Sequence, residues 1–216
     1  MGIAERRGRE RIALRTRIVE AARDIVSEQG LDALSMRAIA ERVEYSPATL
    51  YLYFRDKDEL LREVVTEGFR RLGDASRAQL AALPEGSDAA EHHRALGRAY
   101  ARFALENTGY FRVMFELPAV AHAGLEPCCI HSADSGDEND PLHIVIETVR
   151  RGIEEGLIQL GDARRGALIS WGLIHGLTSL YLSGHLREVE SHEEFLKLVE
   201  EAMASVGAGW STRRCS

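Results

Sequence analysis

The segment that decides the fold is 35–61, which reads SMRAIAERVEYSPATLYLYFRDKDELL. Ser35 precedes an apolar pattern of helical spacing and therefore predicts the N-cap of a helix. Ser46 followed by Pro47 predicts a second, very short helix, because proline is favoured at the first helical position. Two short helices joined by a tight turn predict a helix-turn-helix.

Long helices are predicted on both sides of this segment. The first runs from about Arg9 to Gln29 and stops at Gly30, which can adopt the left-handed conformation of a helix end. The second begins after Asp56, because Asp56 and Glu59 have the spacing of a capping box. Residues 1–62 are therefore predicted to form a helical DNA-binding domain.

The remainder of the chain also has helical periodicity, and the sequence contains no run of strand-like alternation or hairpin signal. A break at 84–87 precedes the later helices, and the last one is expected to begin after Ser191 and to end at Gly207. The prediction is an all-α fold of about nine helices, with residues 63–216 forming a second helical domain. The later helices are expected at about 88–106, 109–116, 141–155, 163–183 and 192–206.

Charge is divided unevenly along the 216 residues, whose net charge is −7. Residues 1–62 carry 12 basic and 11 acidic side chains, whereas 63–216 carry 15 and 23. Six arginines lie within 1–17, against only Glu5 and Glu10. A basic N-terminus on an acidic chain indicates a polyanionic partner at that end, although a short arginine run can also be a solvated tail.

The second short helix carries side chains suited to DNA. Ser46, Thr49 and Tyr51 supply hydroxyls for phosphates or base edges, and the methyl groups of Ala48 and Thr49 suit a thymine methyl. Lys57 lies in the first turn of the following helix, where free N–H groups also favour a phosphate.

Four stretches together resemble the DNA-binding domain of the TetR family of transcriptional repressors: 17–22, Gly30, 35–40 and 46–61. The turn departs from the family pattern. It usually carries a small residue, often glycine, and then a branched apolar one, but Glu44 and Tyr45 occupy these positions here. Glu44 must therefore adopt the turn conformation without the freedom of glycine.

The resemblance implies individual roles. Thr49, Tyr51 and Lys57 match family positions that bind backbone phosphates, and Tyr53 matches an aromatic or histidine position. The residues predicted to form the core are Ile39, Val43, Leu50 and Phe54. An alternative for Tyr51 is that its ring packs in this core and only its hydroxyl is exposed. Arg37, Pro47 and Ala48 match positions facing the groove, so the predicted DNA-binding residues are Arg37, Ser46, Pro47, Ala48, Thr49, Tyr51, Tyr53 and Lys57.

Residues 107–115 and 171–177 resemble the C-terminal domain of one TetR subgroup, which has a Trp and a His-Gly pair in its penultimate helix. Aromatic walls with a few polar groups are typical of an apolar ligand pocket. The alternative is that the same side chains fill the core, with His175 as a helix-packing residue. The predicted ligand-binding residues are Tyr100, Phe103, Phe111, Met114, Phe115, Trp171 and His175.

The stretch 166–186 is uncharged for 21 residues, but its polar residues and glycines indicate a buried helix rather than a membrane span. Gly172 and Gly176 would let another helix approach closely. Together with an apolar stripe on the last helix that includes Phe195, Val199 and Met203, this predicts a four-helix dimer interface, which the resemblance also implies.

Other classes of protein have little support. The three cysteines and the charged N-terminus indicate a cytoplasmic protein. His122, Cys128, Cys129 and His131 match no standard zinc spacing, and the sequence lacks the common nucleotide, metalloprotease and serine-hydrolase motifs, so we expect no metal, no cofactor and no enzyme.

We expect a homodimeric repressor that a small hydrophobic ligand releases from a palindromic operator in duplex DNA. Residues 1–62 would bind the DNA, and residues 63–216 would form the dimerisation and ligand-binding domain. The alternative is a helical ligand-binding or protein-interaction module without inducible DNA release.

Overall fold

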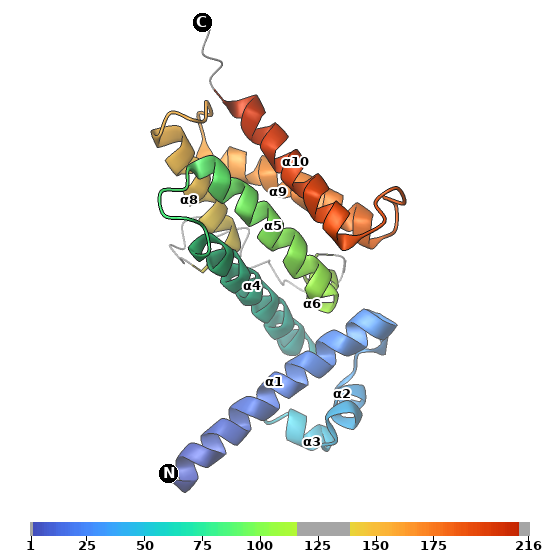
Figure 1. Cartoon of the computed structure of the whole chain (residues 1–216). Helices are drawn as coiled ribbons and strands as arrows, with labels where there is room; N and C mark the ends of the chain where they lie inside the picture. The colour runs from blue at the N-terminus through green and yellow to red at the C-terminus, as the bar shows by residue number, and fades with distance from the viewer. Residues whose placement is uncertain (1, 116–138, 212–216) are drawn as a thin grey trace, which may run out of the picture. The chain divides into compact units, whose positions relative to one another are not determined.

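The computed structural model describes residues 2–115 and 139–211, and this part of the chain is all-helical (Figure 1). It contains nine α-helices and one short 3-10 helix, which confirms the predicted fold class. The α-helices are α1 (Ile3–Gln29), α2 (Met36–Val43), α3 (Pro47–Leu50), α4 (Lys57–Ala81), α5 (Ala89–Glu106), α6 (Thr108–Phe115), α8 (Pro141–Glu154), α9 (Ala163–Leu182) and α10 (His192–Trp210), and the 3-10 helix is Leu31–Ala33.

The helices form two compact units. The first contains the residues up to Gly68 and the segment that begins at Asn107, so it holds α1, α2, α3, the first half of α4 and α6. The second contains Phe69–Glu106 and the described residues from Asn139 onward, which include α5, α8, α9 and α10. The contact boundary thus falls within α4, and the functional division at residue 62 stays a prediction.

Most helices begin at the side-chain caps that the sequence predicts. Each cap accepts a hydrogen bond from a backbone N–H of the first turn, which satisfies a donor that the helix leaves unpaired. Gly30 ends α1 with a φ of 85°, in the region that favours glycine. The predicted caps observed in this role are Ser35, Ser46 and Ser191, and Asp140 and Asp162 cap α8 and α9 in the same way.

Two predicted helix ends are wrong. The first helix begins at Ile3, not near Arg9, and the Glu5 carboxylate accepts a hydrogen bond from the Gly2 N–H at its start (3.0 Å). The last helix continues past Gly207 to Trp210, whose carbonyl accepts a hydrogen bond from the Gln159 N–H (2.7 Å). A helical glycine costs about 1 kcal/mol relative to alanine, and such a tertiary contact offsets that cost.

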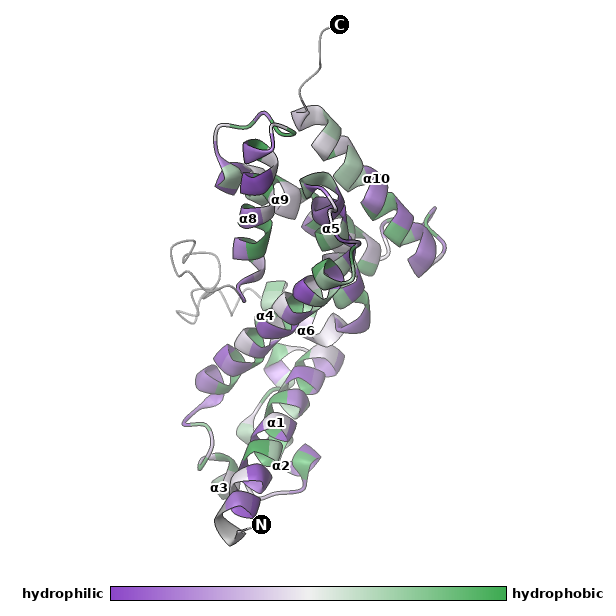
Figure 2. Ribbon diagram, turned by 60° about the vertical axis from the view of Figure 1, so that its left-hand side comes forward, coloured by the Kyte–Doolittle hydropathy of each residue, from purple (hydrophilic) through white to green (hydrophobic). Residues whose placement is uncertain are grey.

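The first unit has a core formed by α1, α2, α3 and α4. Ile39, Val43, Leu50 and Phe54 are all buried there, as the sequence predicts. The short α6 packs on the C-terminal half of α1, where the guanidinium of Arg23 lies 4.9 Å from the centre of the Tyr110 ring. Along α4, hydrophilic and hydrophobic residues lie side by side, as in an amphipathic helix (Figure 2).

The second unit buries the apolar stripe of α10 within its own chain. Phe195 and Val199 have no exposed surface, and Met203 is 3% exposed. The Met203 side chain lies over Gly97 of α5, so closely that a Cβ on Gly97 would come within 2.6 Å of its Cγ. Phe195, Val199 and Met203 are therefore covered by their own chain and are unavailable to a partner, because a periodic apolar stripe shows that a face is covered but not by which chain. The four-helix dimer interface itself stays a prediction.

Helix α9, which is uncharged after Arg165, has both a buried and an exposed face. Ile174 and Thr178 are buried, whereas Ile169 and Leu180 are 51% and 44% exposed. Within the described residues, no helix is both long enough and apolar enough for a membrane span.

Candidate nucleic-acid interface and effector site

The turn between α2 and α3 is held by backbone geometry at Glu44. This residue has a φ of 62° and a ψ of 41°, the left-handed conformation that the sequence requires there. The Tyr45 N–H donates to the Ala40 carbonyl (3.0 Å), which closes the end of α2 in the manner of a Schellman motif. Arg17 of α1 donates to the Val43 carbonyl (3.1 Å), so α1 fixes the direction in which the chain enters α3.

Helix α3 presents its polar side to solvent. Ser46 Oγ accepts from the Thr49 N–H (3.2 Å) and lies 2.9 Å from Thr49 Oγ1. Leu50 anchors the helix in the core, while Pro47 and Ala48 are exposed. Tyr51 is 56% exposed, which contradicts the alternative that it packs in the core with only its hydroxyl outside.

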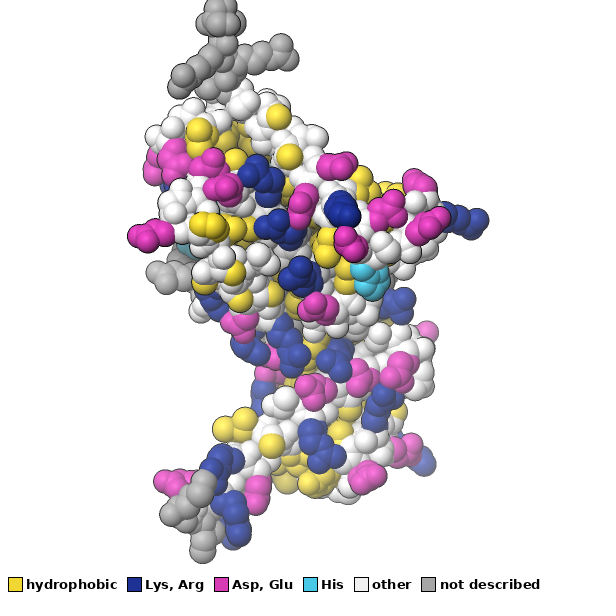
Figure 3. All heavy atoms as spheres, in the orientation of Figure 1, with side chains coloured by type: hydrophobic (Ala, Val, Ile, Leu, Met, Phe, Trp, Pro, Cys, Tyr) yellow, Lys and Arg dark blue, Asp and Glu magenta, His cyan; other side chains and the backbone are white. Residues whose placement is uncertain are grey.

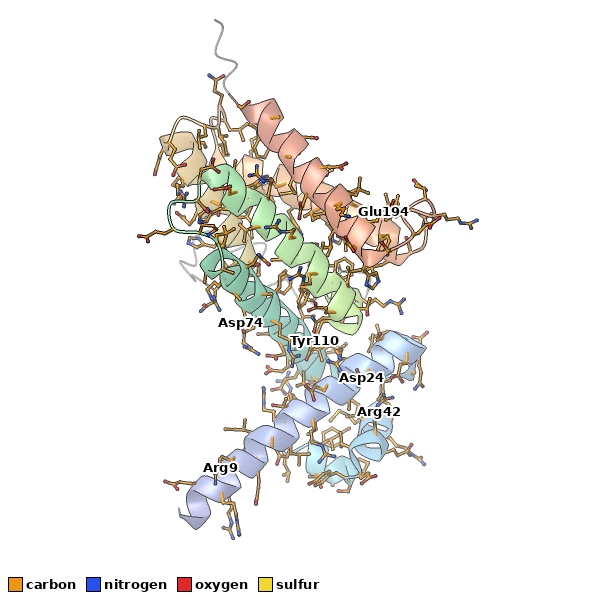
Figure 4. All side chains as sticks on the ribbon, in the orientation of Figure 1. Arg9, Asp24, Arg42, Asp74, Tyr110 and Glu194 are labelled. Carbon is orange, nitrogen blue, oxygen red and sulfur yellow. The ribbon has the colours of Figure 1, made fainter. Side chains whose placement is uncertain are left out.

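Ion pairs connect α2, the first helix of the helix-turn-helix, to α1. Arg42 donates two hydrogen bonds to the Glu28 carboxylate (2.7 and 2.8 Å) and lies 3.8 Å from Asp24 (Figure 4). The hydrogen bonds from Arg42 lower the pKa of Glu28, and those to Glu28 raise the pKa of Arg42. Arg42 is therefore engaged within the domain, whereas Arg37 is exposed and pairs with Glu41 (3.1 Å).

The start of α4 is capped by Asp56, next to the half-buried Lys57. Asp56 Oδ1 accepts from the Glu59 N–H (2.8 Å), and Glu59 in turn accepts from the Arg55 N–H (2.6 Å). The backbone hydrogen bond from Glu59, followed by that from the Arg55 guanidinium, lowers the pKa of Asp56. Lys57 thus lies in the first turn of a capped helix, as a phosphate contact there requires.

The predicted DNA-binding residues all have accessible side chains. Arg37, Ser46, Pro47, Ala48 and Tyr51 are exposed. Thr49, Tyr53 and Lys57 are partly exposed. This accessibility is necessary for contact with DNA, and the individual roles stay predictions.

Three residues near this surface were missed. Leu52 is 73% exposed and Tyr45 is 44% exposed. Arg11 of α1 lies with its guanidinium 5.8 Å from the centre of the Tyr53 ring. The burial of Leu50 and Phe54, four residues apart, was the signal that could have placed Leu52 outside, whereas the contact of Arg11 is long-range and has no local signal.

Three of the predicted ligand-binding residues form a polar network between α5 and α9. The Tyr100 hydroxyl lies 2.8 Å from His175 Nδ1 and is also hydrogen-bonded to the Trp171 side chain. Burial raises the pKa of Tyr100, and the Trp171 hydrogen bond only partly opposes this. Burial also lowers the pKa of His175, so both groups are neutral near pH 7. Phe103, buried one turn after Tyr100, belongs to the same unit.

The other three predicted ligand-binding residues lie on α6, in the unit that contains the helix-turn-helix. Phe111 and Met114 are buried, and the rings of Phe111 and Phe115 are 5.2 Å apart. The sequence did not indicate that the seven residues would be divided in this way, because the grouping depends on the packing of α6 on α1.

A separate cavity of about 290 Å³ lies among the start of α5, the segment at 157–158 and the end of α10. None of the seven predicted residues lines it. His93 at its wall is 3% exposed, and its Nε2 lies 2.7 Å from Ser170 Oγ. Burial, followed by the charge of Arg94, lowers the pKa of His93 to about 4.

The group of His122, Cys128, Cys129 and His131, for which no metal is expected, lies outside the described residues. Among the residues that the structure does describe, no group of three or more His, Cys, Asp or Glu side chains is arranged to hold a metal ion. The expected absence of a metal site stays a prediction.

Two family models cover most of the chain. Residues 18–64 match "Bacterial regulatory proteins, tetR family", and 93–203 match "Tetracyclin repressor-like, C-terminal domain". The second match alone spans more than half of the chain. The chain belongs to the TetR family. The TetR family consists of bacterial regulatory proteins, and the curated relatives of this TetR-family protein are named as HTH-type transcriptional regulators.

Individual relatives agree with the family. The HTH-type transcriptional regulator UidR of Escherichia coli K12 is 42% identical over 57 residues, which are 26% of this chain and 29% of UidR. The HTH-type transcriptional repressor KstR of Mycolicibacterium smegmatis is 42% identical over 68 residues, 31% of this chain and 33% of KstR. The matched region thus spans no more than about a third of these curated relatives.

The whole fold is similar to solved structures. A TetR family transcription regulator from Marinobacter aquaeolei VT8 has a TM-score of 0.71, with 95% of this chain and 99% of that chain covered. Its 21% sequence identity supports the fold of this TetR-family protein and nothing more specific.

Proposed function

We propose that this protein is a cytoplasmic homodimeric repressor that binds a palindromic operator and is released from it by a small apolar effector. The observation that carries the proposal is the α2–turn–α3 unit, whose second helix is anchored by the buried Leu50 and exposes Pro47 and Ala48. A dimer of such units would engage two half-sites about 34–36 Å apart, or a multiple of that distance. The repressor role is supported by the name of the relative KstR.

Phosphate and base contacts divide among different residues. Ser46 Oγ already accepts the Thr49 N–H, and if its own proton goes to Thr49 Oγ1, the Thr49 hydroxyl can donate to a phosphate. Lys57 would add a charge at the start of α4. Pro47 and Ala48, the exposed residues of the first turn of α3, would face the base edges.

Lys57→Ala tests the phosphate contact. Each lost phosphate contact flattens the slope of log affinity against log salt by about 0.9, without changing sequence preference. Lys197→Ala is the matched control, because Lys197 is an exposed lysine of α10 paired with Glu193. An unchanged slope for Lys57→Ala, measured by fluorescence anisotropy, refutes the phosphate assignment.

Ala48→Ser tests the base contact instead and should change which operator sequence the protein prefers.

The exposed face of α9 supports the dimer. Ile169 and Leu180 leave apolar surface uncovered, and a Cβ built on Gly172 or Gly176 would meet no other atom within 4 Å in the described chain. Small residues between apolar ones allow a second helix to approach closely. A second copy of α9 is the occupant that fits, because a twofold interface places the same patch of both subunits together.

The Tyr100–Trp171–His175 network supports an effector site. Few polar groups among aromatic side chains are typical of pockets for small apolar molecules. Neutral Tyr100 and His175 can exchange their mutual hydrogen bond for one to an effector without burying a charge. We therefore centre the proposed effector site on these three residues and Phe103.

The chain itself offers a route from effector to DNA. Helix α5, which carries Tyr100 and Phe103, ends at Glu106 and is followed directly by Asn107 and α6. In turn, α6 packs on α1, and α1 holds the helix-turn-helix through Arg17. An effector that prefers one position of α6 would therefore change the affinity of the protein for its operator.

Tyr100→Phe tests the effector site, because it removes the hydroxyl and keeps the ring. We expect operator release by a panel of hydrophobic compounds to weaken while the melting temperature changes little. Tyr181→Phe is the control, since Tyr181 lies on α9 and stacks on Phe195 (4.2 Å). If both variants respond to the panel like the wild type, the site is wrongly placed.

Salt dependence separates this proposal from the alternative of a helical interaction module. A DNA-binding regulator should lose affinity for duplex DNA steeply as the salt concentration rises, whereas a module that binds only proteins should show no such salt-dependent DNA binding.

A further inference from the structure

The N-terminal two turns of α1 carry arginines that the proposed DNA surface does not yet include. Helix α1 begins at Ile3, so these arginines lie on a regular helix rather than on an irregular tail. Arginine side chains lie at this end of α1 with acidic side chains among them (Figure 3), and Arg9 projects from the helix (Figure 4). The side chains of Arg7 and Arg9 form no ion pair or hydrogen bond within the described residues.

The arginines lie on two different faces of the helix. Residues four apart share a face, so Arg7, Arg11 and Arg15 form one row, whereas residues two apart point away from each other. Arg15 lies with its guanidinium 4.9 Å from the centre of the Phe54 ring and pairs with Glu63. Arg11 lies 5.8 Å from the centre of the Tyr53 ring. The row therefore runs along the face of α1 on which the residues after α3 pack.

We propose that Arg7 and Arg11 extend the DNA-binding surface by contacting backbone phosphates beside those reached from α3. This inference rests on the proposed DNA contacts of Tyr53 and its neighbours. Arg11 is held at this surface by the Tyr53 ring, and Arg7 continues the row one turn nearer the N-terminus.

The spacing and charge fit a duplex. A helix rises 1.5 Å per residue, so the Cα atoms of Arg7 and Arg11 are about 6 Å apart along α1. Each DNA strand carries one phosphate per 3.4 Å of axis, so the two guanidinium groups can reach different phosphates. The opposite face of α1, which carries Arg6 and Arg9, is less suited to phosphate contacts, because Arg6 lies 3.6 Å from the Glu10 carboxylate.

The two faces supply a matched pair of double variants. One double variant, the Arg7/Arg11 variant, combines Arg7→Ala with Arg11→Ala. The other, the Arg6/Arg9 variant, combines Arg6→Ala with Arg9→Ala and removes the same charge from the opposite side of α1. Alanine is the best helix former, so α1 should persist in both, as far-UV circular dichroism will show. The substrate is a duplex selected by the wild-type full-length protein, with at least ten further base pairs at each end.

The salt slope of binding decides between the outcomes. We expect the Arg7/Arg11 variant to lose about 0.9 in slope per phosphate contact, or about 3.6 for two contacts in each of two protomers, and the Arg6/Arg9 variant to keep the wild-type slope. Equal losses in both variants would show a nonspecific charge effect, and no loss in either would show that α1 does not reach DNA. Both results overturn the inference. If Lys57→Ala still flattens the slope in those cases, the proposed function stands without this contact.

Discussion

Replacing Glu44 with glycine should stabilise the protein, because Glu44 is held in the left-handed region at φ 62° and ψ 41°. This conformation costs a residue with a Cβ about 1–2 kcal/mol. Glycine avoids that cost but loses about 0.4–1 kcal/mol through the larger entropy of its unfolded chain. The Glu44 side chain is exposed, so no core packing is lost. We expect a net gain of about 0.5–1 kcal/mol.

Glu44→Ala separates strain from charge. Alanine keeps the strained conformation, so the free energy of unfolding of Glu44→Ala should stay near the wild-type value, while Glu44→Gly should raise the melting temperature by about 1–4 °C.

Both variants remove the same carboxylate from the turn. If the turn lies close to DNA phosphates, both should bind DNA more tightly, by up to about fivefold per protomer for a charge 4 Å from a phosphate in water.

Thermal melting and anisotropy titrations of the three proteins test these two effects separately. Equal melting temperatures for the glycine and alanine variants would refute the strain argument. Equal DNA affinities for the wild type and both variants would refute the position of Glu44 near the phosphates.

Three further perturbations test the packing. Val199→Glu should cost about 3–5 kcal/mol in unfolding free energy because Val199 is buried in its own subunit, whereas Ile169→Glu should give a folded monomer in ultracentrifugation. Burial holds the pKa of His93 near 4, so stability should fall by about 3 kcal/mol from pH 6.5 to 4 in urea titrations, and His93→Gln should remove this component. Gly73→Ala should cost about 1–3 kcal/mol of unfolding free energy, because its Cβ would lie 2.2 Å from the Asn139 carbonyl oxygen.

Local signals predicted the helix-turn-helix well. The caps Ser35 and Ser46 lie directly beside the helices that they start, and Leu50 and Phe54 are spaced for burial on one side. Such signals involve residues within one or two turns, so the sequence alone contains them. Even the unusual conformation of Glu44 followed from the demands of the turn.

Long-range packing could not be predicted in the same way. The stripe of Val199 and Met203 indicated a covered face, but only the contact with Gly97 identifies α5 as its cover. Similarly, the assignment of α6 to the first unit depends on contacts such as that of Tyr110 with Arg23, which are 87 residues apart in the sequence. Periodicity reports that a side chain is buried and does not report its partner.

Selection from a random duplex library by the purified full-length protein tests the central claim most directly. A dimer that presents two copies of α3 should enrich an inverted repeat, with half-site centres about 10 base pairs apart or a multiple of that spacing. Each selected duplex should bind an even number of chains. Recovery of no enriched sequence, or of a single half-site bound by one chain, would contradict the account.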